Sequence, residues 1–188
     1  MPTPALPVRQ PLLSALRVLA LLATLAASAA HADDYAEVNR LIGAHQYVQA
    51  LASAEGYLAS KPRDPQMRFL KGVIQSETGD SGGAMATFIH ITEDYPELPE
   101  PYNNLAVLYA SQNQFDKARA ALEMAIRINP AYAIAHENLG DVYAKLASQS
   151  YSKALQLDPG NAGLAPKLAL IRQLLTPVAK GAKPAAAS

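Results

Sequence analysis

The chain has 188 residues and no cysteine, and its 16 basic residues are balanced by 16 acidic ones. The absence of cysteine excludes disulfide frameworks, thiolate metal sites and a cysteine nucleophile. Because the chain has no excess of basic residues, nucleic acid is not expected as a partner. Half of the residues are hydrophobic but only 6% are aromatic, and this composition favours closely packed helices over sheets.

The first 32 residues have the pattern of an export signal. Two arginines precede a run of small and apolar residues at 18–30, and the run ends in the A-x-A sequence Ala30-His31-Ala32. This pattern predicts a cleavable signal peptide at 1–32, cut between Ala32 and Asp33, and a periplasmic location in a Gram-negative cell. The alternative is an uncleaved membrane anchor. The length disfavours it, because about 13 apolar residues are fewer than the about 20 that a spanning helix needs.

Prolines recur with a period of 34 residues through the rest of the chain. Pro62, Pro96 and Pro130 are spaced by this period, and each follows an apolar helical segment that must stop there. In the segment 99–132, small and apolar residues recur at helical spacing on both sides of a polar turn at 112–114. These positions are Tyr102, Leu105, Ala106, Tyr109, Phe115, Ala118, Leu122, Ala125 and Pro130.

This arrangement resembles the tetratricopeptide repeat (TPR), a pair of antiparallel helices. The resemblance implies an all-α fold, an α-solenoid of about three to four TPR helix pairs with a shortened last repeat and a C-terminal capping helix. It places a TPR domain at residues 33–175. The repeats fall at about 31–64, 65–98, 99–132 and 133–159, and the resemblance is strongest over 65–143.

The fourth repeat is shortened, because Pro159 lies five residues earlier than the period would place it. Between Tyr143 and Ala154 there is no Gly, Asp or Asn to form the usual turn. We therefore predict one continuous helix from about Ala133 to Leu157. The alternative is a tight turn at 147–150 followed by a short second helix.

The last predicted element is a helix at 165–175. Leu168, Ile171 and Leu175 form one apolar stripe on it. We expect this helix to return across the continuous helix as a cap and to bury Leu168 and Ile171, because the end of a solenoid exposes an apolar face that must be covered. The composition of residues 176–188 predicts a disordered tail.

No pattern in the chain indicates catalysis, a metal or a cofactor. His45 is expected in a turn, His90 on a helix surface and His136 at the bulky position of a first helix, and none has the spacing of a zinc ligand. The glycine run 79–83 has neither the preceding strand nor the following basic residue of a phosphate loop, so we expect a loose turn. The chain is therefore not expected to be an enzyme.

The resemblance implies a peptide-binding groove formed by the first helix of each repeat. The predicted groove residues are Tyr35, Asn39, Phe69, Leu70, Val73, Glu77, Asn103, Asn104, Val107, Glu137, Asn138, Asp141 and Lys145. This surface is apolar at one end and carries acidic residues and asparagines at the other, which indicates a partner segment with an apolar anchor beside basic groups. Asn104 and Asn138 can both donate to and accept from a peptide backbone; the alternative is that they are merely solvated.

These features predict a periplasmic adaptor that binds a segment of an envelope protein in the concave TPR groove. A protein or peptide partner is expected, and no transmembrane segment after signal cleavage. The alternative is a homo-oligomer, a self-associating structural subunit of an envelope assembly. Its apolar patch is expected around Tyr35, Leu41 and Tyr47.

Overall fold

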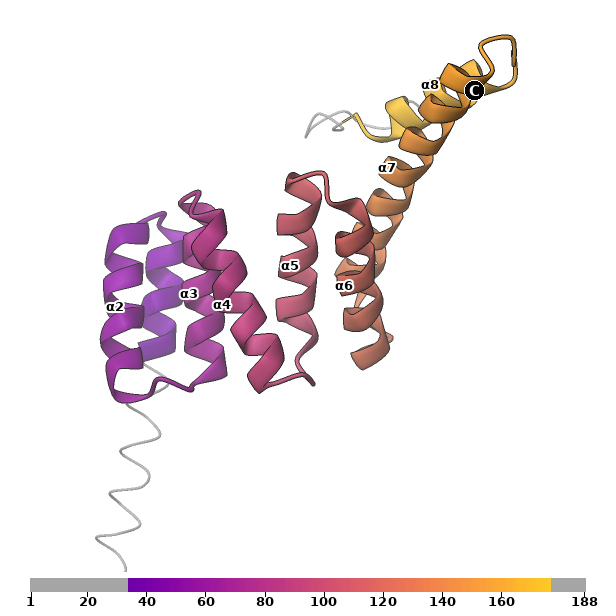
Figure 1. Ribbon diagram of the computed structural model, residues 1–188. Helices are drawn as coiled ribbons and strands as arrows, with labels where there is room; N and C mark the ends of the chain where they lie inside the picture. The colour runs from indigo at the N-terminus through magenta and orange to yellow at the C-terminus, as the bar shows by residue number, and fades with distance from the viewer. Residues whose placement is uncertain (1–33, 177–188) are drawn as a thin grey trace, which may run out of the picture. The chain divides into compact units, whose positions relative to one another are not determined.

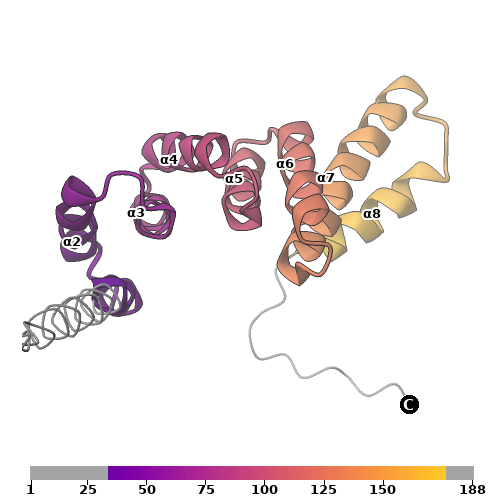
Figure 2. The ribbon, with the colours of Figure 1, turned by 90° about the horizontal axis from the view of Figure 1, so that it is seen from below.

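The computed structural model describes residues 34–176, and this part of the chain is helical with short connections (Figures 1 and 2). The all-α prediction is therefore confirmed. The predicted signal peptide, its cleavage point and the tail beyond Thr176 lie outside the described residues. The chain divides between Asp80 and Ser81 into two compact units, which we call the first unit (34–80) and the second unit (81–176).

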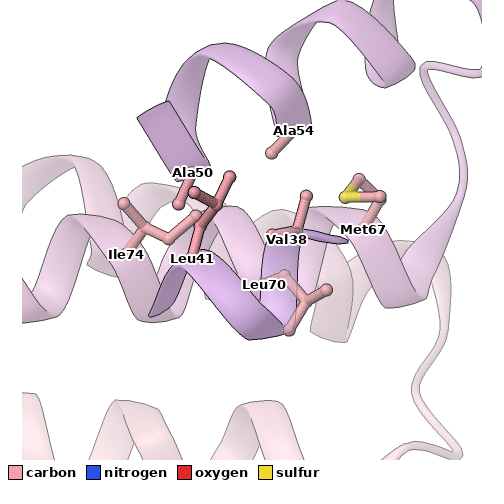
Figure 3. Close-up of a cluster of buried hydrophobic side chains, with 7 residues drawn as sticks. All are labelled: Val38, Leu41, Ala50, Ala54, Met67, Leu70 and Ile74. Atoms are coloured by element: carbon pink, nitrogen blue, oxygen red, sulfur yellow. The ribbon is translucent and has the colours of Figure 1, made fainter. Parts of the chain in front are cut away.

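The first unit contains a helical segment at 34–43, α2 (Tyr47–Ser60) and α3 (Pro65–Glu77). Its core forms where apolar stripes of all three helices meet (Figure 3). The alanines of α2 in this core are completely buried and let the neighbouring helices approach closely. The core residues are Val38, Leu41, Ala50, Ala54, Met67, Leu70 and Ile74.

Burial in the first unit corrects the predicted self-association patch. Leu41 is only 4% exposed. Tyr35 and Tyr47 pack against the same core. The patch around Tyr35, Leu41 and Tyr47 is therefore largely internal packing, because the helical segment at 34–43 turns its apolar stripe toward α2 and α3.

The second unit contains α4 (Ser81–Asp94), α5 (Pro99–Ser111), α6 (Phe115–Ile128), α7 (Ala133–Leu157) and α8 (Leu164–Leu174). Consecutive helices contact one another from α4 to α8. The core between α5, α6 and α7 consists of Ala106, Phe115, Ala118, Leu122, Ala125, Ala135 and Val142. Four of these seven are alanines, so the helix backbones pack closely.

The predicted continuous helix is confirmed, because α7 runs unbroken from Ala133 to Leu157. It ends two residues before Pro159, as α2, α4 and α6 end two residues before Pro62, Pro96 and Pro130. The helix α8 folds back beside α7 (Figure 2). Leu168 is buried there as predicted, whereas Ile171 is only partly buried.

The turn at the glycine run is shorter than predicted. The helix α4 already begins at Ser81, so Gly82 and Gly83 lie in its first turn and not in a loop. Further along the helix, Ala84, Phe88 and Ile91 are fully buried. Packing of this apolar face stabilises the helix more than the two glycines weaken it.

Three turns between helices use a residue with positive φ, and these residues recur with the 34-residue period. They are His45 (φ 56°), Gly79 (φ 82°) and Asn113 (φ 58°). The backbone N–H of the next residue, Gln46 or Gln114, bonds back to a carbonyl in the last turn of the preceding helix. One period further on stands Ala147, which lies inside α7.

Alanine substitution is expected to have opposite effects at two glycines of the first unit. At Gly79 a Cβ meets nothing within 4 Å, so Gly79→Ala is expected to destabilise the chain only through left-handed backbone strain, by about 1–2 kcal/mol. Gly56 lies inside α2, where a Cβ also has open space, and Gly56→Ala is expected to stabilise the helix by about 0.5–1 kcal/mol. Urea unfolding of both variants measures the signs. Equal effects would contradict the turn geometry.

Candidate functional site

The second unit has an apolar pocket between α5, α6 and α7, with a volume of about 180 Å³. Small side chains on α5 leave this space open, and Leu122 of α6, which is fully buried, closes it from below. The side chain of Val107 is 49% exposed at the pocket. The lining residues are Ala106, Val107, Ala110, Leu122, Asn138, Asp141 and Val142. Three of them, Val107, Asn138 and Asp141, are predicted groove residues.

A side-chain hydrogen bond joins the two helices beside this pocket. The Nδ2 of Asn138 on α7 donates to the Oδ1 of Asn103 on α5 over 2.8 Å. Asn103 is only 6% exposed, and a buried amide needs such a partner. Asn104 instead donates to the backbone carbonyl of Glu100 on its own helix. Neither Asn104 nor Asn138 is merely solvated, and the Asn138–Asn103 bond holds α7 at a fixed place beside α5.

Charged residues follow one side of α7 next to the pocket. Glu137, Asp141 and Lys145 are exposed and lie four residues apart, so they share one helix face. Within residues 34–176, neither Glu137 nor Asp141 forms a salt bridge. The two carboxylates therefore remain available to a cationic group at the edge of the pocket.

The predicted groove residues of the first unit have mixed environments. Phe69 and Val73 are partly buried, and Asn39 is exposed and donates to the backbone carbonyl of Tyr35. Glu77 is exposed and accepts a hydrogen bond from the hydroxyl of Tyr47 over 3.2 Å.

Leu70 is a correction to the predicted groove. It is 5% exposed and belongs to the core of the first unit. Leu70 lies three positions after Met67 and four before Ile74, so these residues share the inward face of α3.

Tyr35 is a second correction, because its hydroxyl is held inside the first unit. It donates to Oδ2 of Asp64 over 2.6 Å and lies 3.0 Å from the hydroxyl of Tyr57. Oδ1 of Asp64 accepts from the backbone N–H of Met67 and caps α3. One carboxylate thus ties the segment 34–43 and α2 to the start of α3. The role of Tyr35 is structural.

This environment predicts a loss of stability at alkaline pH. Burial, followed by the hydrogen bond to Asp64, raises the pKa of Tyr35 above its ordinary value, which is about 10. The unfolded chain then loses the phenol proton first, so the stabilisation is complete below about pH 10 and falls as pH rises further. Urea unfolding between neutral and alkaline pH should show this fall, and Tyr35→Phe should reduce it. Tyr143→Phe, at an exposed tyrosine, is the control.

Three histidines, His45, His90 and His136, lie within residues 34–176. His45 lies in a turn, with Nδ1 2.8 Å from the hydroxyl of Tyr47, and His90 is exposed on α4, so both predictions are confirmed. His136 lies on α7, the first helix of the fourth repeat, as predicted, and is exposed there with its Nε2 3.0 Å from the carbonyl oxygen of Pro130. In the described range 34–176, no three His, Asp or Glu residues gather as a metal site, and no helix is both long and apolar enough to span a bilayer.

The other four lining residues of the pocket, Ala106, Ala110, Leu122 and Val142, were not predicted as groove residues. Ala106 and Leu122 belong to the 34-residue pattern. Ala110 had no predicted role. A signal was present, because small residues at 106 and 110 are four apart and lie on one face of α5. The spacing alone does not show that α7 stands far enough from this face to leave a cavity.

Comparisons with known proteins agree with this architecture. One family model, described as "TPR repeat", matches residues 108–147, and another, described as "Tetratricopeptide repeat", matches residues 35–96. Together they cover more than half of the chain. A chloroplastic tetratricopeptide repeat domain-containing protein of Arabidopsis thaliana, PYG7, is 33% identical over 99 residues, which are 50% of this chain and 28% of that protein. The chain spans about a quarter of the length of the curated relatives it matches.

Solved structures share the fold. TTC0263, a TPR protein of Thermus thermophilus, superposes with a TM-score of 0.55 at 19% identity, over 75% of this chain and 98% of that one. YrrB, described as a TPR protein with an unusual peptide-binding site, superposes with a TM-score of 0.52 at 26% identity, over 55% of this chain and 54% of that one.

Proposed function

We propose that this chain, which carries tetratricopeptide repeats, is an exported adaptor whose pocket between α5 and α7 binds a segment of another cell-envelope protein. Tetratricopeptide repeats mediate protein–protein interaction through extended surfaces of stacked helices. The observation that carries the proposal is the apolar pocket with the exposed Val107 beside it. The peptide-binding site in the description of YrrB supports a peptide as the type of ligand.

The size of the pocket favours a side-chain anchor over a small-molecule ligand. Small-molecule sites usually measure about 300–1,000 Å³, whereas this pocket measures about 180 Å³. A single aliphatic side chain of the partner would cover Val107 and fill the space above Leu122. Its burial would supply the hydrophobic part of the affinity.

The charges beside the pocket determine which residues of the partner segment can lie next to its aliphatic anchor. Glu137 and Asp141 favour a lysine or arginine next to the aliphatic residue. Because both carboxylates are exposed, their attraction is screened by salt. We therefore expect the partner segment to combine an aliphatic anchor with a neighbouring basic residue, and its binding to weaken as ionic strength rises.

Site-specific crosslinking in live cells tests the adaptor. A photo-reactive amino acid at Val107 is expected to capture a discrete protein partner, identified by mass spectrometry. The same amino acid at Ala120, an exposed position on α6, is the matched control. Asp141→Lys should reduce the capture, whereas Glu93→Lys on α4 should not. Equal capture at Val107 and Ala120, or none at Val107, would contradict the proposal.

The export step rests on the first 32 residues, with their apolar run and A-x-A sequence. We expect the protein recovered from the periplasm to begin Asp-Asp-Tyr. Terminal sequencing of the periplasmic fraction measures this directly. Recovery in the membrane fraction alone, with Met1 retained, would overturn the proposed location. The proposal that the pocket binds a protein segment would then depend only on the crosslinking result.

A further inference from the structure

Within residues 34–176, one face of α7 is more exposed than the equivalent face of α5. On α5, Ala106 is 1% exposed and packs in the core with residues of α6. One period later on α7, Gly140 is exposed and a Cβ there would meet nothing within 4 Å. Tyr143, the counterpart of Tyr109, is 48% exposed. The difference arises because α7 continues straight through Ala147, whereas the chain after α5 turns back as α6. Among the described residues, the helix that folds back beside α7 is α8, which leaves Gly140 and Tyr143 exposed.

The surface that starts at Gly140 continues along the helix, with Ser150 and Leu157 exposed and Ala147 and Ala154 partly buried. Residues that alternate three and four apart keep to one side of a helix over several turns. On α7 these residues are Gly140, Tyr143, Ala147, Ser150, Ala154 and Leu157, which we call the open face. Leu157 is 73% exposed, and none of the six carries a charge.

The neighbours of α7 leave the open face accessible. Leu139, Val142 and Leu146 pack on one side of it, in the core with α6. On the other side, Lys167 of α8 lies 5.7 Å from the ring centre of Tyr151. The open face lies between these two contacts, and its Tyr143 also reaches α6, where the hydroxyl donates to Oε1 of Glu123 over 3.4 Å while the residue stays 48% exposed.

The large and small residues of the open face alternate so that two copies of the face fit each other when the helices run antiparallel. Paired antiparallel with a second copy, Gly140 lies opposite Leu157, Tyr143 opposite Ala154, and Ala147 opposite Ser150. Each layer then joins a larger side chain with a small one, or two small ones, as close packing requires. A parallel pairing would set glycine against glycine and tyrosine against tyrosine.

A second observation supports helix packing at this face. Ala118 and Ala125, which are fully buried where α6 packs against α5, lie 12 and 5 residues before Pro130. Counted back in the same way from Pro159, the equivalent residues of α7 are Ala147 and Ala154. The half of α7 near Pro159 thus carries the small residues that let a second helix approach a first.

We propose that two copies of this chain associate through the open face, with their α7 helices antiparallel. Each copy then supplies the second helix that the shortened fourth repeat of the other lacks. The overlap of residues 140–157 is about 27 Å long at 1.5 Å per residue and one helix wide. Such an interface is smaller than the roughly 1,200 Å² of a stable one. The dimer is therefore weak, and its formation depends on concentration.

Sedimentation of the full chain over a concentration series tests the pairing. The native chain should pass from monomer to dimer as concentration rises. Gly140→Leu should raise the dissociation constant about tenfold or more, because the new side chain meets Leu157 of the second copy. Gly56→Leu is the matched control, since Gly56 is also helical, exposed and open at its Cβ, and it should leave association unchanged.

The double variant Gly140→Leu, Leu157→Ala exchanges the sizes within one layer and should restore dimerisation to near the native level. Circular dichroism checks that each variant is folded. Gly140→Leu is expected to keep the helix, because leucine has a higher helix propensity than glycine. A chain that stays monomeric at the highest concentration overturns the proposal. So does association that Gly140→Leu leaves unchanged, or that the double variant does not restore.

Discussion

A proline at position 148 is expected to destabilise the chain by about 3 kcal/mol or more. Ser148 lies in the middle of α7, which is continuous from Ala133 to Leu157. Proline there removes a backbone hydrogen bond and clashes with the carbonyl one turn earlier. The helix would break between the part that packs on α6 and the part that packs on α8. Chemical denaturation of Ser148→Pro against the native chain measures the loss.

The matched control for this experiment is Ala133→Pro at the first residue of the same helix. An N–H in the first helical turn has no intrahelical partner, and proline is well accepted there. Tyr132 before it has φ −76° and ψ 86°, outside the α region that a following proline disfavours. Ala133→Pro should therefore stay close to the native stability. A Ser148→Pro variant as stable as this control would show that α7 has a turn near 148 in solution.

The helix pattern could be predicted from the sequence because local chemistry controls it. Prolines end helices through their fixed φ and missing N–H, so the 34-residue period of Pro62, Pro96 and Pro130 marks the ends of α2, α4 and α6. The absence of turn residues near Ala147 likewise predicted the continuous α7. The glycines at 82 and 83 misled the prediction, because burial of α4 outweighs a local propensity.

The site was predicted less completely, because a position on a helix does not show which neighbour covers it. Val107, Asn138 and Asp141 do meet at one pocket. Leu70 instead turned into the core. Tyr35 bonds to Asp64, 29 residues away. Such a contact depends on tertiary packing, and no periodicity in the sequence encodes it.

Replacing Leu122 with alanine is expected to cost about 2–5 kcal/mol of unfolding free energy. Leu122 is fully buried at the centre of the core between α5, α6 and α7, and it closes the pocket from below. The neighbouring alanines are too small to fill the space that the leucine leaves, so the existing pocket would deepen into the core. Leu174→Ala is the matched control, because Leu174 is 71% exposed on α8, and it should change stability by less than about 0.5 kcal/mol. Urea unfolding of the two variants gives the comparison. An equally small loss of stability in Leu122→Ala and Leu174→Ala would mean that the pocket collapses around the smaller side chain. In that case the cavity proposed to hold the partner's anchor would not be a rigid feature of the second unit.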